Sequence, residues 1–209
     1  MVALVVPSML ALLLSMLFGG SLSAWSTLRV HWWPVAGTSL LVQAVLFSPL
    51  LEEQPWAIAW GPWLYVATMA GVLLALLASA RVGQVGRLAL SVAAIGVALN
   101  CMVVALNSGY MPRSEHATAL LGRSPTARSD EANPRLVNVQ PIDEATRLAW
   151  LGDIIPEPGW LPLANVVSIG DLLLSGGLAW WTVNVTSPSA GWPIRRRRFD
   201  AGCASGEPG

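Results

Sequence analysis

The chain has 209 residues, of which 54% are hydrophobic and only 11% are charged. Its mean hydropathy of +0.57 is too high for a soluble globular domain, so the composition predicts a membrane protein. The formal net charge is zero, which gives no indication of nucleic acid as a partner. The lipid bilayer is therefore the first partner that the sequence predicts.

Five apolar segments predict an all-α polytopic membrane protein, because a helix of about 20 apolar residues crosses the hydrocarbon core of a bilayer. The predicted spans are residues 1–21, 34–51, 56–80, 88–106 and 164–185. The first span has a competing interpretation as a secretory signal peptide, since SLSAW at 21–25 resembles a cleavage site with small residues. No basic residue precedes its apolar run, which favours a retained helix.

The arginines predict the orientation of these spans. Alternation of five spans places one group of arginines on the same side of the membrane: Arg29, Arg81, Arg87, Arg195, Arg196, Arg197 and Arg198. The short loop on the other side, 52–55, contains no arginine. The positive-inside rule therefore puts the amino terminus outside and the basic tail, 186–209, on the cytoplasmic side of the cell membrane. The run at 195–198 is interpreted as a basic group at the membrane surface.

The connection between the fourth and fifth spans, 107–163, is predicted to be a large outer loop folded over the helices. Its first half is expected to be irregular. The stretch 142–152, IDEATRLAWLG, has acidic residues at its start, Asp143 and Arg147 four residues apart and a glycine at its end. These features predict a short interfacial helix lying on the membrane.

Polar residues within the apolar segments are the candidate functional residues. Asp171 is an ionisable residue in the fifth span, where a carboxylate costs about 2.5–3.5 kcal/mol at the bilayer centre and so requires a partner or a task. At about 1.5 Å per residue, the side chains of Gln43, Asn100 and Asp171 come to a similar depth, roughly 10 Å below the outer surface. We therefore predict a hydrogen-bonded cluster of Gln43, Asn100, Asn107, Ser168, Asp171 and Ser175.

Three tracts resemble the domain-of-unknown-function family numbered 5317, which consists of small bacterial membrane proteins. They are ALNCMVVALNSGYMP (98–112), LGDIIPEP (151–158) and NVVSIGDLLLSGG (165–177). The resemblance implies a helical membrane protein and supplies no activity.

Asp153 and Asp171 also resemble, in their loop-then-helix placement, the two catalytic carboxylates of lipoprotein signal peptidases. Two carboxylates that share one proton can activate water for amide hydrolysis. The chain departs from that family, however, since it has five predicted spans and not four, and Ser-Ile-Gly precedes Asp171 where Asn-x-Ala is expected. The competing interpretation is that Asp171 only joins two helices, as polar residues between membrane helices commonly do.

No other chemistry is indicated by the sequence. His31 and His116 fall on opposite sides of the predicted membrane, and neither a metal site nor a cofactor is expected. Small residues at 67, 71 and 75 in the third span predict close helix packing. The sequence thus favours a non-catalytic accessory or scaffold subunit of a larger membrane assembly, with an aspartate-dyad peptidase as the alternative.

Overall fold

The structure is a computed structural model, and it describes residues 2–17, 19–20, 33–82, 86–123, 136–161 and 164–186. The chain is mostly helical. The described long helices are α1 (Val2–Leu17), α3 (Trp33–Leu46), α4 (Pro55–Val82), α5 (Arg87–Leu106) and α7 (Ile169–Thr186). Each of them overlaps one of the five predicted spans.

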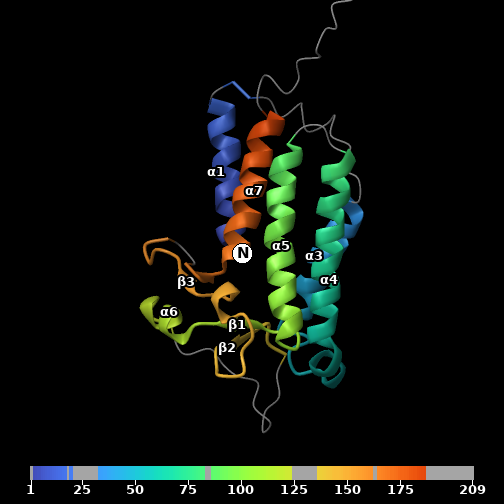
Figure 1. Cartoon of the computed structure of the whole chain (residues 1–209), viewed down its shortest axis with the longest axis vertical. Helices are drawn as coiled ribbons and strands as arrows, with labels where there is room; N and C mark the ends of the chain where they lie inside the picture. The colour runs from blue at the N-terminus through green and yellow to red at the C-terminus, as the bar shows by residue number, and fades with distance from the viewer. Residues whose placement is uncertain are drawn as a thin grey trace, which may run out of the picture.

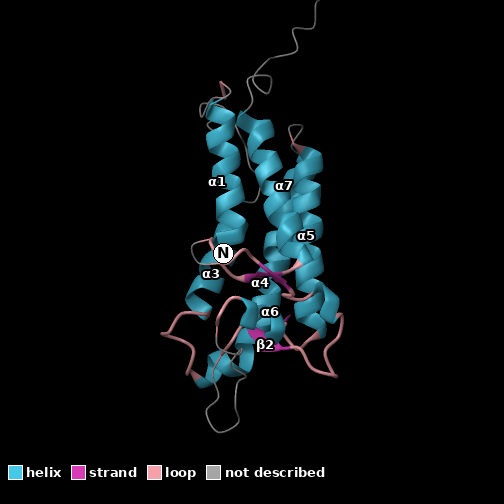
Figure 2. Cartoon of the chain, turned by 90° about the vertical axis from the view of Figure 1, so that its left-hand side faces the viewer, coloured by secondary structure: helices cyan, strands magenta, loops and turns pink. Residues whose placement is uncertain are grey.

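The long helices stand side by side as an elongated bundle (Figure 1). Helix α1 packs on α7, α7 on α5, α5 on α4, and α4 on α3, so α1 and α3 are the two ends of this series. At one end of the bundle, the described residues 107–123, 136–161 and 164–168 form a small cap of short strands, turns and a short helix (Figure 2).

Glycines allow α5 and α7 to approach closely. A Cβ atom added at Gly177 would lie 2.5 Å from the backbone nitrogen of Ala93, and one added at Gly96 would lie 2.6 Å from that of Leu174. A similar approach joins α3 and α4, where a Cβ at Gly71 would lie 2.6 Å from Ser39 Oγ. Of the three small residues predicted to allow close packing, Gly71 lies against α3 and Ala75 is buried, while Ala67 is exposed.

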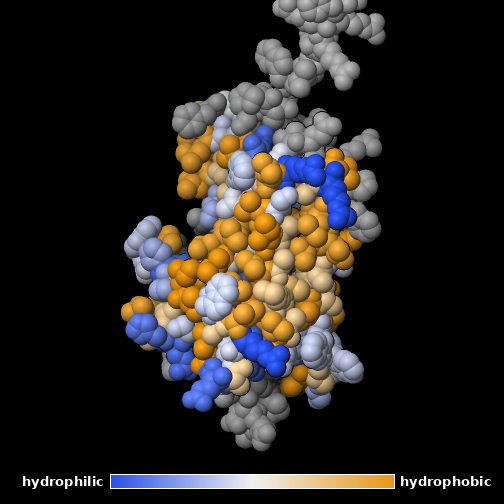
Figure 3. Space-filling model, viewed as in Figure 1, coloured by the Kyte–Doolittle hydropathy of each residue, from blue (hydrophilic) through white to orange (hydrophobic). Residues whose placement is uncertain are grey.

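Among the described residues, two helices, α4 and α5, are long and apolar enough to cross a membrane. Apolar side chains cover the middle of the bundle face in Figure 3, and hydrophilic ones gather towards its ends. Large side chains on the edge helices are exposed to the surroundings, including Leu13 on α1 and Leu41 on α3. This distribution is typical of helices that face lipid, because a soluble protein would bury these side chains.

The cap contains short β-structure that the all-α prediction did not include. Strand β1 (Met111–Arg113) pairs in parallel with β2 (Val139–Pro141), and β3 (Ile155–Pro156) pairs antiparallel with β4 (Val166–Val167). The part of the loop that was expected to be irregular contains helix α6 (Glu115–Leu120). This helix begins at Ser114, whose Oγ accepts a hydrogen bond from the backbone nitrogen of Ala117.

The predicted interfacial helix at 142–152 is wrong, since only the 3₁₀ turn η1 (Ala149–Leu151) is helical there. The side chain of Asp143 accepts hydrogen bonds from Ala145 N and Thr146 Oγ1, which closes a local turn in place of a helix. Leu148 has a left-handed backbone, with φ of 52°, which ends any helical run at that point.

Two predicted helix ends also differ from the structure. The second span was expected to reach residue 51, but α3 ends at Leu46 and turns follow it. The fifth was expected to begin at residue 164, but α7 begins at Ile169, because residues 166–167 pair as strand β4. The predicted basic group, Arg195, Arg196, Arg197 and Arg198, lies outside the described residues.

Candidate functional site

Asn100, Ser168 and Asp171 form a closed hydrogen-bonded triangle between α5 and α7. Asn100 Nδ2 donates to Asp171 Oδ1 at 2.7 Å, and Ser168 Oγ donates to Asn100 Oδ1 at 2.9 Å. The third side joins Ser168 and Asp171 through two further bonds. Asn100 and Ser168 are buried, with 6% and 0% of their surface exposed. The hydrogen bond predicted between Asp171 and Asn100 is thus present.

The two bonds between Ser168 and Asp171 form a capping box. The backbone nitrogen of Asp171 donates to Ser168 Oγ at 3.0 Å, and the backbone nitrogen of Ser168 donates to Asp171 Oδ2 at 3.1 Å. Ser-x-x-Asp before an apolar run is a sequence signature of a helix start, and the carboxylate also favours the positive end of the helix dipole. Asp171 therefore lies in the first turn of α7, whereas the predicted span, 164–185, placed it further inside the helix.

Position 170 requires a glycine, because the backbone of α7 lies against the side chain of Asn100 on α5 there. A Cβ atom added at Gly170 would collide with the side-chain amide of Asn100. The sequence Ser168-Ile169-Gly170-Asp171 therefore combines a helix cap with the space that the partner amide needs.

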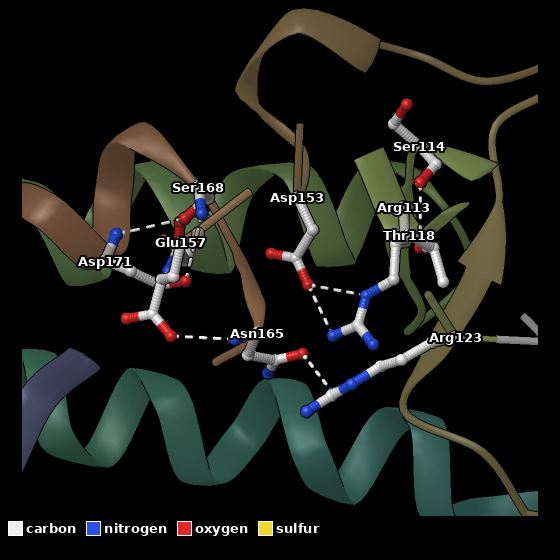
Figure 4. Close-up of polar contacts among 10 residues, drawn as sticks. Arg113, Ser114, Thr118, Arg123, Asp153, Glu157, Asn165, Ser168 and Asp171 are labelled. Atoms are coloured by element: carbon white, nitrogen blue, oxygen red, sulfur yellow. Dashed lines mark hydrogen bonds and ion pairs between the residues drawn. The ribbon is translucent and has the colours of Figure 1, made fainter. Parts of the chain in front are cut away.

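Asp153 lies in the cap and forms an ion pair with Arg113. The Nε and Nη2 atoms of Arg113 donate to Asp153 Oδ2 at 3.1 and 2.8 Å (Figure 4). The backbone joins the same two segments, since Asp153 N donates to Pro112 O and Ser114 N donates to Asp153 O. Asp153 is buried, with 5% of its surface exposed, so its side chain is held between the strand segments of the cap.

Burial raises the pKa of the Asp153 carboxyl from 3.8 to about 6, although the charge and hydrogen bonds of Arg113 oppose this rise. The charge of Asp171 adds to it, so the two carboxylates lie within electrostatic range. A carboxyl with this pKa holds its proton in the folded protein at pH values where it is ionised in the unfolded chain.

This raised pKa predicts a pH dependence of stability. The contribution of Asp153 is fully present below about pH 4 and is lost as the pH rises through about 6, because ionisation then costs more in the folded state. Across that window the loss is on the order of 3 kcal/mol. We expect the melting temperature of the wild-type protein in detergent, minus that of Asp153→Asn, to fall between pH 4 and pH 7. A difference that rises with pH would contradict the assignment.

Asn107 binds the cap and not the triangle. Its Nδ2 donates to the backbone oxygen of Arg147 at 2.9 Å, and its Oδ1 accepts from the backbone nitrogen of Arg147 at 2.9 Å. The backbone N–H and C=O groups of Arg147 are thereby both hydrogen-bonded to Asn107, which follows the last residue of α5. This contact is a second reason why 142–152 does not form a helix, since those groups are not free for helical bonds.

The remaining members of the predicted cluster lie elsewhere. Gln43 is on α3, which packs against α4, whereas the triangle lies between α5 and α7. Ser175 is buried on α7, and its Oγ donates to the backbone oxygen of Asp171 at 2.7 Å, within its own helix. Of the six predicted residues, the structure brings three into the triangle: Asn100, Ser168 and Asp171.

Each of the two carboxylates of the supposed dyad binds a partner of its own. Asp153 accepts from Arg113, and Asp171 accepts from Asn100 and from the backbone of Ser168. Among the described hydrogen bonds, none joins Asp153 to Asp171. A dyad that shares one proton needs such a contact, directly or through one water.

Sequence reasoning missed several polar residues of the cap. The backbone nitrogen of Asn165 donates to Glu157 Oε2 at 2.8 Å, and Arg123 Nη1 donates to Asn165 Oδ1 at 3.3 Å (Figure 4). Arg113 was missed as the partner of Asp153. These pairs join residues 8 to 42 positions apart in short strands and loops, so no periodic pattern could have found them. Within the described residues, no three His, Cys, Asp or Glu side chains are grouped as metal ligands.

The fold and these contacts define a mostly helical protein, two of whose described helices can cross a membrane, with polar contacts that join helices to a cap. The chain belongs to the family of unknown function DUF5317, whose model matches residues 27–183. The resemblance seen in the sequence is thereby confirmed. Searches of curated proteins and of solved structures gave no match, and the likeness to lipoprotein signal peptidases is not shown.

Proposed function

We propose that this chain is a five-span protein of the cell membrane that acts as a non-catalytic accessory or scaffold subunit of a larger membrane assembly. The amino terminus and the cap lie outside, and the carboxy terminus lies in the cytoplasm. This orientation rests on the positive-inside distribution of arginines over five spans that cross the membrane in turn.

The observation that carries the proposal is the open series of helices, α1–α7–α5–α4–α3. Among the described helices, the two edge helices α1 and α3 each pack mainly on one neighbour, which leaves broad apolar faces for lipid or for other membrane proteins. Exposed side chains on α3 include Trp33, Leu40, Leu41 and Val45, and those on α1 include Met9, Leu13 and Leu17.

The contacts of the acidic residues also favour an architectural role. Asp171 caps α7 and binds α5, and Asp153 pairs with Arg113. Both carboxylates therefore have structural tasks. The peptidase alternative retains one argument, which is that the charge of Asp171 contributes to the raised pKa of Asp153.

Purification of the wild-type protein and of Asp171→Asn tests both ideas. In a mild detergent, we expect the wild type to copurify with other membrane proteins in a fixed ratio. Asp171→Asn should retain this assembly, because an amide still accepts one of the two hydrogen bonds of the carboxylate. The readout is the subunit ratio on a sizing column.

Two outcomes would contradict the proposal. A clean, stable monomer in mild detergent would count against a subunit role. A hydrolytic activity that Asp171→Asn abolishes, while assembly stays intact, would favour the enzyme.

A further inference from the structure

Two arginines lie at the end of the bundle that is opposite the cap. Arg81 is in the last turn of α4 and Arg87 is the first residue of α5, and both side chains are exposed. The described ion pair joins Arg113 to Asp153 in the cap, and neither Arg81 nor Arg87 has a side-chain partner among the described residues. Two positive charges therefore stand without a described partner at the ends of neighbouring helices.

Complementary negative charge lies far from these two arginines. The carboxylates of the described residues are in the cap, in the turn before α4 or in the first turn of α7: Glu52, Glu53, Glu115, Asp143, Glu144, Asp153, Glu157 and Asp171. Of these, Asp171 binds Asn100, which is thirteen residues and about 20 Å along α5 from Arg87. The described part of the end opposite the cap thus carries positive charge and is complementary to an anion.

The positive charges lie at the level of lipid headgroups when α5 crosses the membrane. This helix has 20 residues and a length of about 30 Å, which is the thickness of the hydrocarbon core, so Arg87 and Leu106 lie at opposite surfaces. Tryptophans mark the surface at Arg87. A Cβ atom added at Gly86 would lie 2.6 Å from Trp181 Cδ1, and Trp180 is 46% exposed. Tryptophan favours the headgroup level of a bilayer.

Exposed apolar side chains extend from each arginine towards the middle of the membrane. On α4, Leu77 precedes Arg81 by four residues and lies on the same side of the helix. On α5, Leu88 follows Arg87, and Ile95 lies seven residues further along the same face. Figure 3 shows hydrophilic side chains at the upper end of the bundle, above an apolar surface. A ligand that matches both parts has an anionic head and an apolar chain.

We infer that Arg81 and Arg87 bind the phosphate of an anionic phospholipid, whose acyl chains lie along α4 and α5. Guanidinium groups donate charge-assisted hydrogen bonds to phosphate oxygens. An anionic lipid is favoured over a zwitterionic one, because each arginine near the membrane surface attracts its net charge. An acidic segment of a protein would match the charges but not the apolar side chains below them. This inference rests on the membrane-spanning arrangement of the proposed function.

Single cysteines labelled with the fluorophore NBD report which lipid lies beside each end of α5. The background carries Cys101→Ala and Cys203→Ser. The test site is Leu88→Cys, next to Arg87, and the control is Leu106→Cys at the other end of the helix. The two leucines are 70% and 41% exposed and lie on the same face, because eighteen residues make about five turns. Vesicles contain phosphatidylcholine and phosphatidylglycerol, one of which carries a doxyl quencher on its acyl chain.

We expect NBD at 88 to be quenched several-fold more by doxyl-phosphatidylglycerol than by doxyl-phosphatidylcholine at the same mole fraction. NBD at 106 should be quenched equally by both. Equal quenching by both lipids at 88, or the same preference at 88 and 106, would overturn the inference and leave the five-span proposal standing. Lipid quenching at 106 with none at 88 would also overturn it, because another protein segment would then cover the arginines. The absence of lipid quenching at both sites would overturn the inference and the five-span proposal.

Substitution of the arginines tests whether they cause the preference at 88. The double variant Arg81→Gln and Arg87→Gln should abolish it, whereas Arg81→Lys and Arg87→Lys should retain most of it, since lysine also binds phosphate as a point charge. The matched control is Arg147→Gln, an exposed arginine of the cap, which should leave the preference unchanged. A preference for phosphatidylglycerol that survives the double glutamine variant would assign the lipid to other charges and overturn the inference.

Discussion

Replacement of Gly177 by alanine is expected to destabilise the bundle, whereas the same replacement at its neighbour, Gly176, is not. The new methyl group at 177 would lie 2.5 Å from Ala93 N and 2.7 Å from Ala89 O, which are backbone atoms of α5 that cannot rotate away. Helices α5 and α7 would have to separate, at a cost of about 1–3 kcal/mol. At Gly176 the methyl group meets nothing within 4 Å, and alanine gains about 0.5–1 kcal/mol of helix propensity.

Unfolding of both variants in mixed detergent micelles measures this difference. The midpoint of Gly177→Ala should fall and that of Gly176→Ala should stay or rise, relative to the wild type. The two positions are adjacent on one helix, so the comparison cancels effects of expression and of detergent. Equal midpoints for the two variants would show that α5 and α7 do not pack at Gly177.

The positions of the long helices could be predicted because neighbouring residues in the sequence decide where these helices begin and end. The ends of α4 and α5 lie within two residues of the predicted spans, since Pro55 and the glycine-containing segment before Arg87 interrupt the apolar runs. The start of α7 was misplaced by five residues. The sequence contains its signal, Ser-x-x-Asp at 168–171, which we interpreted only as part of the polar cluster.

The cap could not be predicted, because distant residues decide its conformation. The stretch 142–152 has a helical pattern, but the side chain of Asn107, forty residues earlier, takes both peptide groups of Arg147. The ion pair of Arg113 and Asp153 likewise joins segments forty residues apart. Tertiary contacts of this kind override local propensity and leave no periodic signal.

Residues of the predicted polar cluster meet where they lie on two helices that pack on each other. They do not meet where they only lie at a similar depth in the membrane. Asn100 and Asp171 lie on facing helices, so their similar depth brought them into contact. Gln43 was placed at the same depth but lies on α3, which packs on α4. Depth along a helix follows from counting residues, whereas the order of helices across the bundle does not.

Replacement of Asn100 by leucine is expected to have the largest effect of any change at the triangle. Leucine has a similar size, but it removes the donor to Asp171 Oδ1 and the acceptor for Ser168 Oγ. Each buried group left without a partner costs about 1–3 kcal/mol. The unfolding midpoint of Asn100→Leu in detergent should therefore fall well below that of the wild type.

A double-mutant cycle with Ser168→Ala separates this effect from a general loss of packing. Ser168→Ala alone removes the cap of α7, which costs about 1 kcal/mol, and also leaves the Asn100 oxygen unpaired. The double variant has no serine hydroxyl, so the loss of the Asn100 oxygen leaves no hydroxyl without a partner. The combined loss should consequently be smaller than the sum of the two single losses, by about 0.5–3 kcal/mol. Strict additivity would mean that Asn100 and Ser168 do not interact, and α5 and α7 would then be joined here by the bond between Asn100 and Asp171 alone.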